Sequence, residues 1–192
     1  MRLLIMGPPG AGKGTQATGI AAHYAIPAVS SGDLFRGHIK SQDALGRKVS
    51  ALIARGEFVP DVLTTSMVFR RLLQPDAAAG WLLDGYPRTL GQVEALDLAM
   101  GELGTQLDAV ISLVADPAAL VGRMLRRAQL EGREDDNEET IQHRIEVYRL
   151  QTEPVLAEYR GRGSVLEVDA LGEVAEVTER IAAALDRRLG SA

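Results

Sequence analysis

The chain has 192 residues, of which 46% are hydrophobic and 24% charged, and its formal net charge is -5. This composition is ordinary for one globular domain and excludes a fibrous or wholly disordered chain. An acidic chain has no bulk attraction for nucleic acid or anionic lipid, so neither is expected as a partner. The absence of cysteine excludes disulfide scaffolds and thiolate metal sites.

The apolar runs are all far shorter than the roughly 20 residues that cross a bilayer, and the first residues show no export signal. We therefore expect a cytoplasmic protein without a membrane partner. Nothing in the sequence marks an obligate interface, so a monomer is the default expectation.

Short apolar runs alternate with helical patterns along the chain. Each run is continuous rather than alternating, which is typical of strands buried on both faces of a parallel sheet. We expect strands over residues 2–6, 28–30, 81–84, 109–114 and 165–168. We expect helices over residues 13–24, 34–40, 44–55, 62–73, 89–100, 117–128, 137–160 and 173–189. The pattern predicts an α/β fold with a doubly wound parallel sheet, whose ligands bind beyond the carboxyl ends of the strands.

Two segments depart from simple alternation. Residues 32–74 hold three helical patterns and no strand, which predicts an inserted helical subdomain. In the long helix expected over residues 137–160, Pro154 predicts a kink. The residues Asp136 to Glu139 have the pattern of a capping box that opens this helix, rather than of a metal-binding acidic cluster.

A glycine-rich run, Gly-Pro-Pro-Gly-Ala-Gly-Lys-Gly-Thr over residues 7–15, follows the first expected strand and opens a helix. Glycines let the backbone turn so that N–H groups point inward at the helix amino terminus, where an anion is favoured. Lys13 adds a positive charge for the outer phosphates. The run predicts a phosphate-binding loop formed by Gly10, Ala11, Gly12, Lys13, Gly14 and Thr15. Gly14 stands where the general motif has Ser or Thr, which leaves a role for Thr15 on magnesium open.

Two further motifs place arginines near the same sheet edge. In the run Ser-Ser-Gly-Asp-Leu-Phe-Arg over residues 30–36, Ser31 suits a helix N-cap and Arg36 suits a small dianion. In the run Leu-Asp-Gly-Tyr-Pro-Arg-Thr over residues 83–89, Asp84 can hold water bound to Mg²⁺, Gly85 permits close approach and Arg88 projects from the turn. Each motif also suits an ordinary helix start, the second with Thr89 as N-cap.

A third group of arginines, Arg123, Arg126, Arg127, Arg133 and Arg144, surrounds a short polar segment. Such a group is usually a solvated basic helix face. It also suits phosphoryl transfer, in which fixed cations stabilise the charge that spreads over the moving group. A movable segment that carries them would exclude water from the reaction. The histidines share no spacing and are assigned no role.

Taken together, these motifs resemble the nucleoside monophosphate kinases, and most closely the short-lid adenylate kinases. The resemblance implies a P-loop NTPase-type fold with five parallel strands over residues 1–192. It implies an AMP-binding insertion over residues 30–59, a short lid over 127–136 and a core over 1–29, 60–126 and 137–192. The implied reaction is reversible transfer of the γ-phosphoryl group of Mg·ATP to AMP, which gives two ADP and serves adenine nucleotide homeostasis. A lid without Cys or His ligands implies no zinc site.

The resemblance also implies the role of individual residues. The phosphate loop, Arg127 and Gly172 would bind ATP, and Asp135 and Asp136 would orient the lid arginines. The catalytic cations would be Lys13, Arg88, Arg123, Arg133 and Arg144, together with magnesium. AMP would be bound by Ser31, Arg36, Glu57, Phe58, Val59, Gly85, Tyr86, Pro87, Arg88, Gln92, Arg133 and Arg144, with Gln92 facing the base.

Two other functions stay open from the sequence. A uridylate-cytidylate kinase usually carries Ala at the Ser31 position and Asn at the Thr89 and Gln92 positions, so these three side chains favour adenylate. The second alternative is a non-catalytic switch that signals through its ATP state. Such a switch would require neither a second anion site at Arg36 and Arg88 nor a lid of arginines supplied by the same chain.

Overall fold

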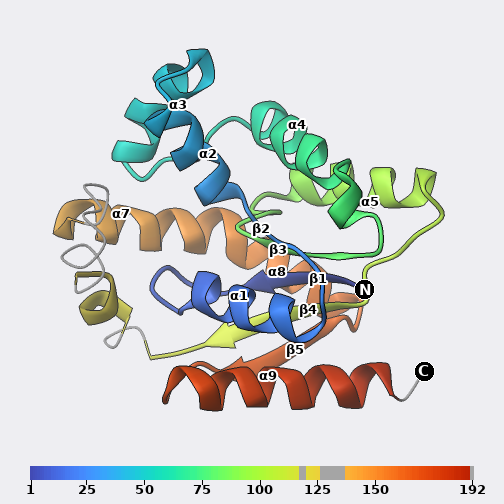
Figure 1. Cartoon of the computed structure of the whole chain (residues 1–192). Helices are drawn as coiled ribbons and strands as arrows, with labels where there is room; N and C mark the ends of the chain where they lie inside the picture. The colour runs from blue at the N-terminus through green and yellow to red at the C-terminus, as the bar shows by residue number, and fades with distance from the viewer. Residues whose placement is uncertain (117–119, 126–136, 191–192) are drawn as a thin grey trace.

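The computed structural model describes residues 1–116, 120–125 and 137–190. One sheet of parallel strands has the order β2-β3-β1-β4-β5 (Figure 1). Its strands are β1 (Arg2–Met6), β2 (Ala28–Ser30), β3 (Trp81–Asp84), β4 (Ala109–Val114) and β5 (Val165–Asp169), and only β5 is longer than expected, by one residue. Since β1 lies between β3 and β4, the chain leaves β1 at the point where the strand order reverses, which is where such sheets bind ligands.

The helices connect the strands largely as expected. They are α1 (Lys13–His23), α2 (Ser31–Lys40), α3 (Ala44–Ala54), α4 (Asp61–Leu72), α5 (Leu90–Glu102), α7 (Glu138–Val147), α8 (Glu153–Gly161) and α9 (Val174–Leu189). Residues 120–125 are also helical, and a short 3₁₀ helix spans Pro75–Ala77. None of the helices described is long and apolar enough to cross a membrane.

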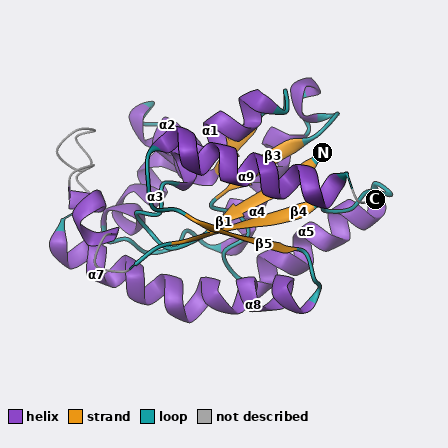
Figure 2. Ribbon diagram, turned by 90° about the horizontal axis from the view of Figure 1, so that it is seen from below, coloured by secondary structure: helices purple, strands orange, loops and turns teal. Residues whose placement is uncertain are grey.

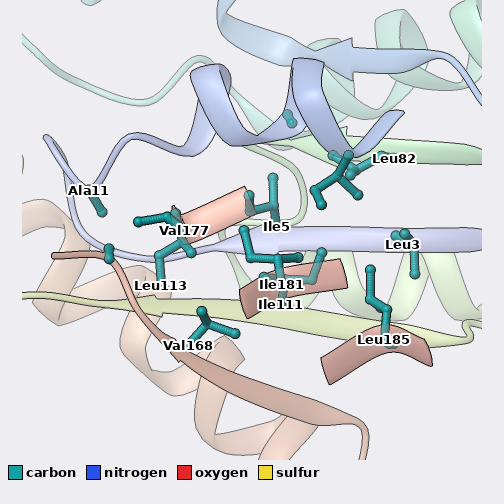
Figure 3. Packing of buried hydrophobic residues seen from close by; sticks show 14 of the residues in the cluster. Leu3, Ile5, Ala11, Leu82, Ile111, Leu113, Val168, Val177, Ile181 and Leu185 are labelled. Carbon is teal, nitrogen blue, oxygen red and sulfur yellow. The ribbon is translucent and has the colours of Figure 1, made fainter. Parts of the chain in front are cut away.

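The sheet is covered on both faces, with α1 and α9 on one side and α8 on the other (Figure 2). Successive side chains of β1 therefore enter two different cores, because neighbouring residues of a strand point to opposite faces. Leu3 and Ile5 join the cluster that includes Ile181 and Leu185 of α9 (Figure 3). Leu4 and Met6 join the cluster formed with α5 and α8. This burial on both faces explains why the strands read as continuous apolar runs.

The helices α2 and α3 pack against each other and project beside the carboxyl ends of the strands (Figure 1). They have a small apolar core of their own, in which Phe35, Val49 and Val59 are buried. Gly46 allows the close approach, since a Cβ there would lie 2.1 Å from the carbonyl oxygen of His38. The inserted helical segment expected between the second and third strands is thus present, with its own packing.

The long helix expected over residues 137–160 is interrupted. A π-helical turn at Tyr148–Thr152 separates α7 from α8. Pro154 lies in the first turn of α8, where its missing N–H group costs no helical bond, so the break precedes the proline. The expected capping box is wrong by one position: Asn137 is the N-cap, and its side chain accepts the N–H of Thr140 at 2.9 Å.

Candidate active site

The phosphate-loop run connects β1 to α1 and is anchored in the core. Ala11 is 2% exposed and belongs to the cluster with Leu113 and Val177 (Figure 3). Gly10 and Gly12 have φ values of 82° and 84°, which favour glycine. A Cβ at Gly10 would lie 2.7 Å from the carbonyl oxygen of Leu120. The loop is therefore fixed by packing that only these small residues permit.

Lys13 begins α1 and reaches back across the loop. Its Nζ donates hydrogen bonds to the carbonyl oxygens of Gly7, at 2.8 Å, and Pro8, at 2.9 Å. The N-cap, Gly12, has no side chain to cover the N–H groups of the first turn, and the helix dipole adds positive potential there. Main chain and ammonium group together suit a polyphosphate.

The second motif opens α2 differently from the expectation. Ser30, rather than Ser31, is the N-cap, because the Ser30 side chain accepts the N–H of Asp33 at 3.3 Å. Ser31 is then buried in the first turn, where its hydroxyl donates to the carbonyl oxygen of Gly85 at 2.7 Å. That bond joins the start of α2 to the turn after β3, so the two arginine-bearing motifs are in direct contact.

Three arginines converge at this contact. Arg88 lies over the Phe58 ring at 5.1 Å, and Arg36 pairs with Asp33 at 2.5 Å. Burial lowers the pKa of Arg88 to about 10, an effect that the charges of Arg144 and Arg36 strengthen and that of Asp84 opposes. The group still carries its proton at neutral pH. A half-buried site with this much positive charge is suited to a phosphate dianion.

Gly85 makes room for the Arg88 guanidinium. A Cβ there would lie 2.6 Å from Nη2 of Arg88 and 2.7 Å from Oγ of Ser31, and its φ of 78° also favours glycine. Gly56 does the same for Arg144, because a Cβ would lie 2.7 Å from Cγ of that side chain. Close approach of the backbone thus lets both cations reach the same space.

Gln92 and Tyr86 are almost fully buried behind Arg88, at 2% exposure each. The Gln92 amide accepts the N–H of Arg88 at 2.8 Å through Oε1 and donates to Asp61 at 2.7 Å through Nε2. The Tyr86 hydroxyl contacts Thr65 at 3.1 Å and donates to the carbonyl oxygen of Gln92 at 3.2 Å. Burial raises the pKa of Tyr86 to about 12, so the phenol stays neutral.

The residues expected to bind phosphates line one cleft of about 740 Å³ at the carboxyl ends of the strands. It brings together the loop residues Gly10, Ala11, Gly12, Lys13, Gly14 and Thr15 with Arg36, Phe58, Asp84, Gly85, Tyr86, Pro87, Arg88, Arg123, Arg144 and Gly172. A smaller pocket of about 80 Å³ adjoins it and is lined by Ser31, Arg36, Glu57, Phe58, Val59, Gly85, Arg88, Gln92 and Arg144. The donor and acceptor sets predicted from the sequence therefore meet in space.

Arg123 and Gly172 line the main cleft but not this small pocket. Nη1 of Arg123 donates to the carbonyl oxygen of Ala170 at 3.1 Å, so Arg123 is held against the turn that follows β5. In that turn Gly172 has a φ of 116°, and a Cβ would lie 2.5 Å from Oε2 of Glu176. Four other residues expected at the site, Arg127, Arg133, Asp135 and Asp136, lie outside the described residues, as does the expected lid over 127–136.

Comparison with known proteins agrees with this geometry. The family model for adenylate kinase matches residues 5–164. The chain belongs to the adenylate kinase family. The adenylate kinase of Clavibacter michiganensis subsp. michiganensis is 58% identical over 187 residues, which cover 97% of this chain and 94% of that protein. Those of Leifsonia xyli subsp. xyli and Thermobifida fusca are 53% and 48% identical, over 97% and 98% of this chain and 94% and 100% of theirs.

Membership of the adenylate kinase family confirms the predicted fold class, the phosphotransferase class and the adenylate kinase activity. A pyrimidine monophosphate kinase and a non-catalytic switch are not favoured. Phosphoryl transfer in this family depends on ATP. The roles of single residues, the subdomain boundaries and the oligomeric state stay predictions.

The residues at the cleft are also suited to the magnesium ion that accompanies ATP. Asp84 ends β3 and is half-buried in the cleft, and a Cβ at Gly14 would lie 3.6 Å from its Oδ2. One carboxylate next to the phosphate loop fits an ion that keeps several waters and binds mainly through substrate phosphates. The described residues contain no cluster of three or more His, Asp or Glu side chains able to hold a metal, and the absence of zinc stays a prediction because the lid is outside them.

Sequence reasoning missed two residues that hold Arg88 in place. Asp61 begins α4 and accepts hydrogen bonds from both Thr89 and Gln92. Thr152, 5% exposed in the π-helical turn, donates to the carbonyl oxygen of Arg88 at 3.2 Å. An acidic residue in the first turn of a helix and a threonine near the start of a helix are common, so neither gave a signal in the sequence.

Proposed function

We propose that this cleft transfers the γ-phosphoryl group of Mg·ATP directly to AMP, giving two ADP. The observation that carries the proposal is the convergence of the phosphate loop and the arginine-lined pocket on one cleft of about 740 Å³. Two anion sites within one cleft are what transfer between two nucleotides needs, and a protein that only binds ATP needs just the first.

The donor nucleotide is assigned to the loop side of the cleft. The N–H groups at the start of α1 and the ammonium group of Lys13 hold the outer phosphates of ATP. The adenine of ATP lies against the backbone of Gly172, and Arg123 and Arg127 contact the phosphates. The bond from Arg123 to Ala170 supports this assignment, because it ties a phosphate-binding cation to the adenine-binding turn.

The acceptor nucleotide is assigned to the smaller pocket. Arg36 and Arg88 hold the phosphate of AMP, and Gln92 faces its base. The segment Glu57 to Val59 lines the part of the pocket that we assign to the base. Arg55 holds Glu57 by two hydrogen bonds of 2.8 and 3.0 Å, which lower the pKa of the Glu57 carboxyl group. The carbonyl oxygen of Gly85, bonded to Ser31, keeps the two halves of the pocket together.

The transfer step needs no covalent intermediate and no general base. An oxygen of the AMP phosphate, already deprotonated at neutral pH, forms a bond to the γ-phosphorus while the bond to the β-phosphate oxygen breaks and leaves ADP. Lys13, Arg88, Arg123, Arg133 and Arg144 stabilise the charge on the moving group, and catalysis is alignment plus charge neutralisation. Mg²⁺, held through water by Asp84, would neutralise the donor phosphates when bound.

Two segments are proposed to close over the nucleotides. The insertion over residues 30–59 has its own apolar core, which supports movement as a unit. The lid over residues 127–136 would bring Arg127 and Arg133 to the phosphates, oriented by Asp135 and Asp136. Closure would exclude water and protect ATP from hydrolysis. We expect the monomer to be sufficient, since the acceptor and loop residues named come from a single chain.

The test is to incubate the purified protein with Mg·ATP and each of AMP, CMP, UMP and GMP and to follow diphosphate formation. We expect rapid diphosphate formation when AMP is the acceptor and none with the other three monophosphates. Transfer to CMP or UMP instead would overturn the assignment of Ser31 and Gln92 to adenine. Bound ATP that stays unchanged with every acceptor would overturn the transfer reaction itself.

A further inference from the structure

Asp61 joins Gln92, which lines the acceptor pocket, to Thr89, which follows Arg88 in the chain. This carboxylate is the first residue of α4 and is half-buried against the start of α5. Its Oδ2 accepts the hydroxyl of Thr89 at 2.6 Å, and its Oδ1 accepts Nε2 of Gln92 at 2.7 Å. Thr89 in turn caps α5 by accepting the N–H of Gln92 at 3.2 Å. Asp61, Thr89 and Gln92 therefore form one closed hydrogen-bonded unit.

This unit fixes which way the Gln92 amide points. An ionised carboxylate can only accept hydrogen bonds, so Nε2 must face Asp61. A main-chain N–H can only donate, so Oε1 must face Arg88, whose N lies 2.8 Å away. Rotating the amide by 180° would set its oxygen against the carboxylate and its NH₂ against an N–H group. With 2% of Gln92 exposed, water cannot compensate for that loss.

One donor and one acceptor of the amide remain for a ligand. Nε2 has a second hydrogen and Oε1 a second lone pair, and Gln92 lines the small pocket. A 6-aminopurine offers an amino donor beside a ring-nitrogen acceptor. A 6-oxopurine offers the reverse pair, a carbonyl acceptor beside a ring N–H. In one orientation the Gln92 amide therefore matches a 6-aminopurine, and after a rotation by 180° it would match a 6-oxopurine instead.

Resting on the AMP site proposed above, we infer that Asp61 is a specificity-determining positioning residue. Asp61 fixes the Nε2 end of the Gln92 amide and the N–H of Arg88 fixes its Oε1 end. Through its share of this restraint, Asp61 makes the acceptor pocket favour 6-aminopurine monophosphates over 6-oxopurine monophosphates. Asp61 acts through Gln92 and touches no substrate itself.

The sharpest pair of acceptors is AMP and IMP, which have the same size and phosphate and differ in this donor–acceptor pair. The sharpest variant is Asp61→Asn, which keeps the shape of the side chain. An asparagine can turn either an oxygen or an NH₂ group toward Gln92, so in this variant only the N–H of Arg88 still favours the native amide orientation. The measured quantity is the ratio of kcat/KM for AMP to kcat/KM for IMP, with KM for ATP measured alongside.

A matched control lies in the 3₁₀ helix Pro75–Ala77, which follows α4. Asp76 also accepts two side-chain hydrogen bonds, of 2.9 and 2.7 Å, but from Arg71, which does not line the acceptor pocket. Asp76→Asn therefore removes an equivalent carboxylate without touching Gln92. Thermal unfolding of both variants checks that each is folded, and Asp61→Ala gives a second way to remove the restraint on Nε2 of Gln92.

For Asp61→Asn we expect the AMP-to-IMP ratio to fall about tenfold, with KM for ATP within about twofold of the unchanged chain. Asp76→Asn should leave the ratio unchanged. An equal loss with both acceptors, an unchanged ratio in both Asp61 variants, or a fall of the same size in Asp76→Asn would overturn the inference. If the unchanged chain forms no ADP from AMP, the proposed function itself fails, which is a different result from an unchanged ratio.

Discussion

The donor and acceptor sides of the cleft are built in opposite ways. The proposed donor side is built mainly on one run of consecutive residues, the phosphate loop, which would bind through its main chain and is anchored by the buried Ala11. The proposed acceptor side is assembled from side chains on α2, α5, α7 and the turn after β3, and Arg88 in that turn is held by Thr152, which lies far away in the chain. A site made of backbone can be recognised from a short stretch of sequence, whereas a site made of side chains depends on how distant elements pack.

The largest effect is expected on the donor side, from Lys13→Met. Lys13 is the side-chain cation of the loop, and its loss removes charge stabilisation from the moving phosphoryl group. We expect kcat/KM to fall about 1,000-fold with little change in unfolding temperature. Steady-state kinetics with AMP and Mg·ATP measures it. Lys48→Met, on an exposed position of α3, is the matched control and should keep full activity.

On the acceptor side, Arg88→Ala should lower kcat/KM about 100-fold while the fold stays intact. The physical reason is the loss of the cation that we assign to the acceptor phosphate and the transferred group. The control is Arg162→Ala, because Arg162 lies over Tyr159 at 5.2 Å much as Arg88 lies over Phe58, but at a distance from the cleft. Near-normal turnover of Arg88→Ala would contradict the assignment.

A smaller effect is expected from Gly85→Ala, which tests whether the acceptor pocket still works when the side chains of Arg88 and Ser31 are displaced. The added Cβ would meet Arg88 and Ser31 at under 3 Å. We expect KM for AMP to rise about tenfold and KM for ATP to change little, with a stability loss of about 1–2 kcal/mol from the positive φ. Gly37→Ala in α2 has no neighbour within 4 Å of its Cβ and should be neutral or stabilising. Equal changes in both KM values would argue against separate sites.

The smallest effect concerns the anchoring of α2 to α3. Asp43 caps α3 by accepting the N–H of Gly46 at 2.8 Å and contacts Nδ1 of His38 at 2.5 Å, and these bonds lower its pKa to about 2. Because the folded-state pKa is below the ordinary value, the stabilisation is present above about pH 4 and is lost as the pH falls toward 2. Near pH 6, Asp43→Ala should therefore unfold at a lower urea concentration than the unchanged chain. The difference between the two urea midpoints should become smaller near pH 3. A difference in urea midpoint that does not change with pH would show that the ionised form of Asp43 adds nothing to the stability of the fold.

Much of the fold could be predicted from the sequence because its signals are local. Strands buried on both faces gave continuous apolar runs, and all five were found within one residue of their ends. Helix starts were less certain, because the neighbouring serines Ser30 and Ser31 can both cap and only tertiary contact decides between them. The bond from Ser31 to Gly85 takes the second serine out of that role.

The contacts behind the site could not be predicted in the same way. Asp61 and Thr152 are far from Arg88 in the chain and have no motif around them. Their contribution appears only when α4, α5 and the π-helical turn come together. The arginine of the pocket was identifiable from its motif in the sequence, whereas the residues that hold it in place were not.

The central claim is that both nucleotides occupy one cleft at once and that the phosphoryl group passes directly between them. Initial rates measured over a grid of ATP and AMP concentrations test this most directly. We expect double-reciprocal lines that intersect, together with negligible ATP consumption when AMP is omitted. Parallel lines, which indicate a phosphorylated enzyme intermediate, or ATP consumption that does not depend on AMP, would contradict the account.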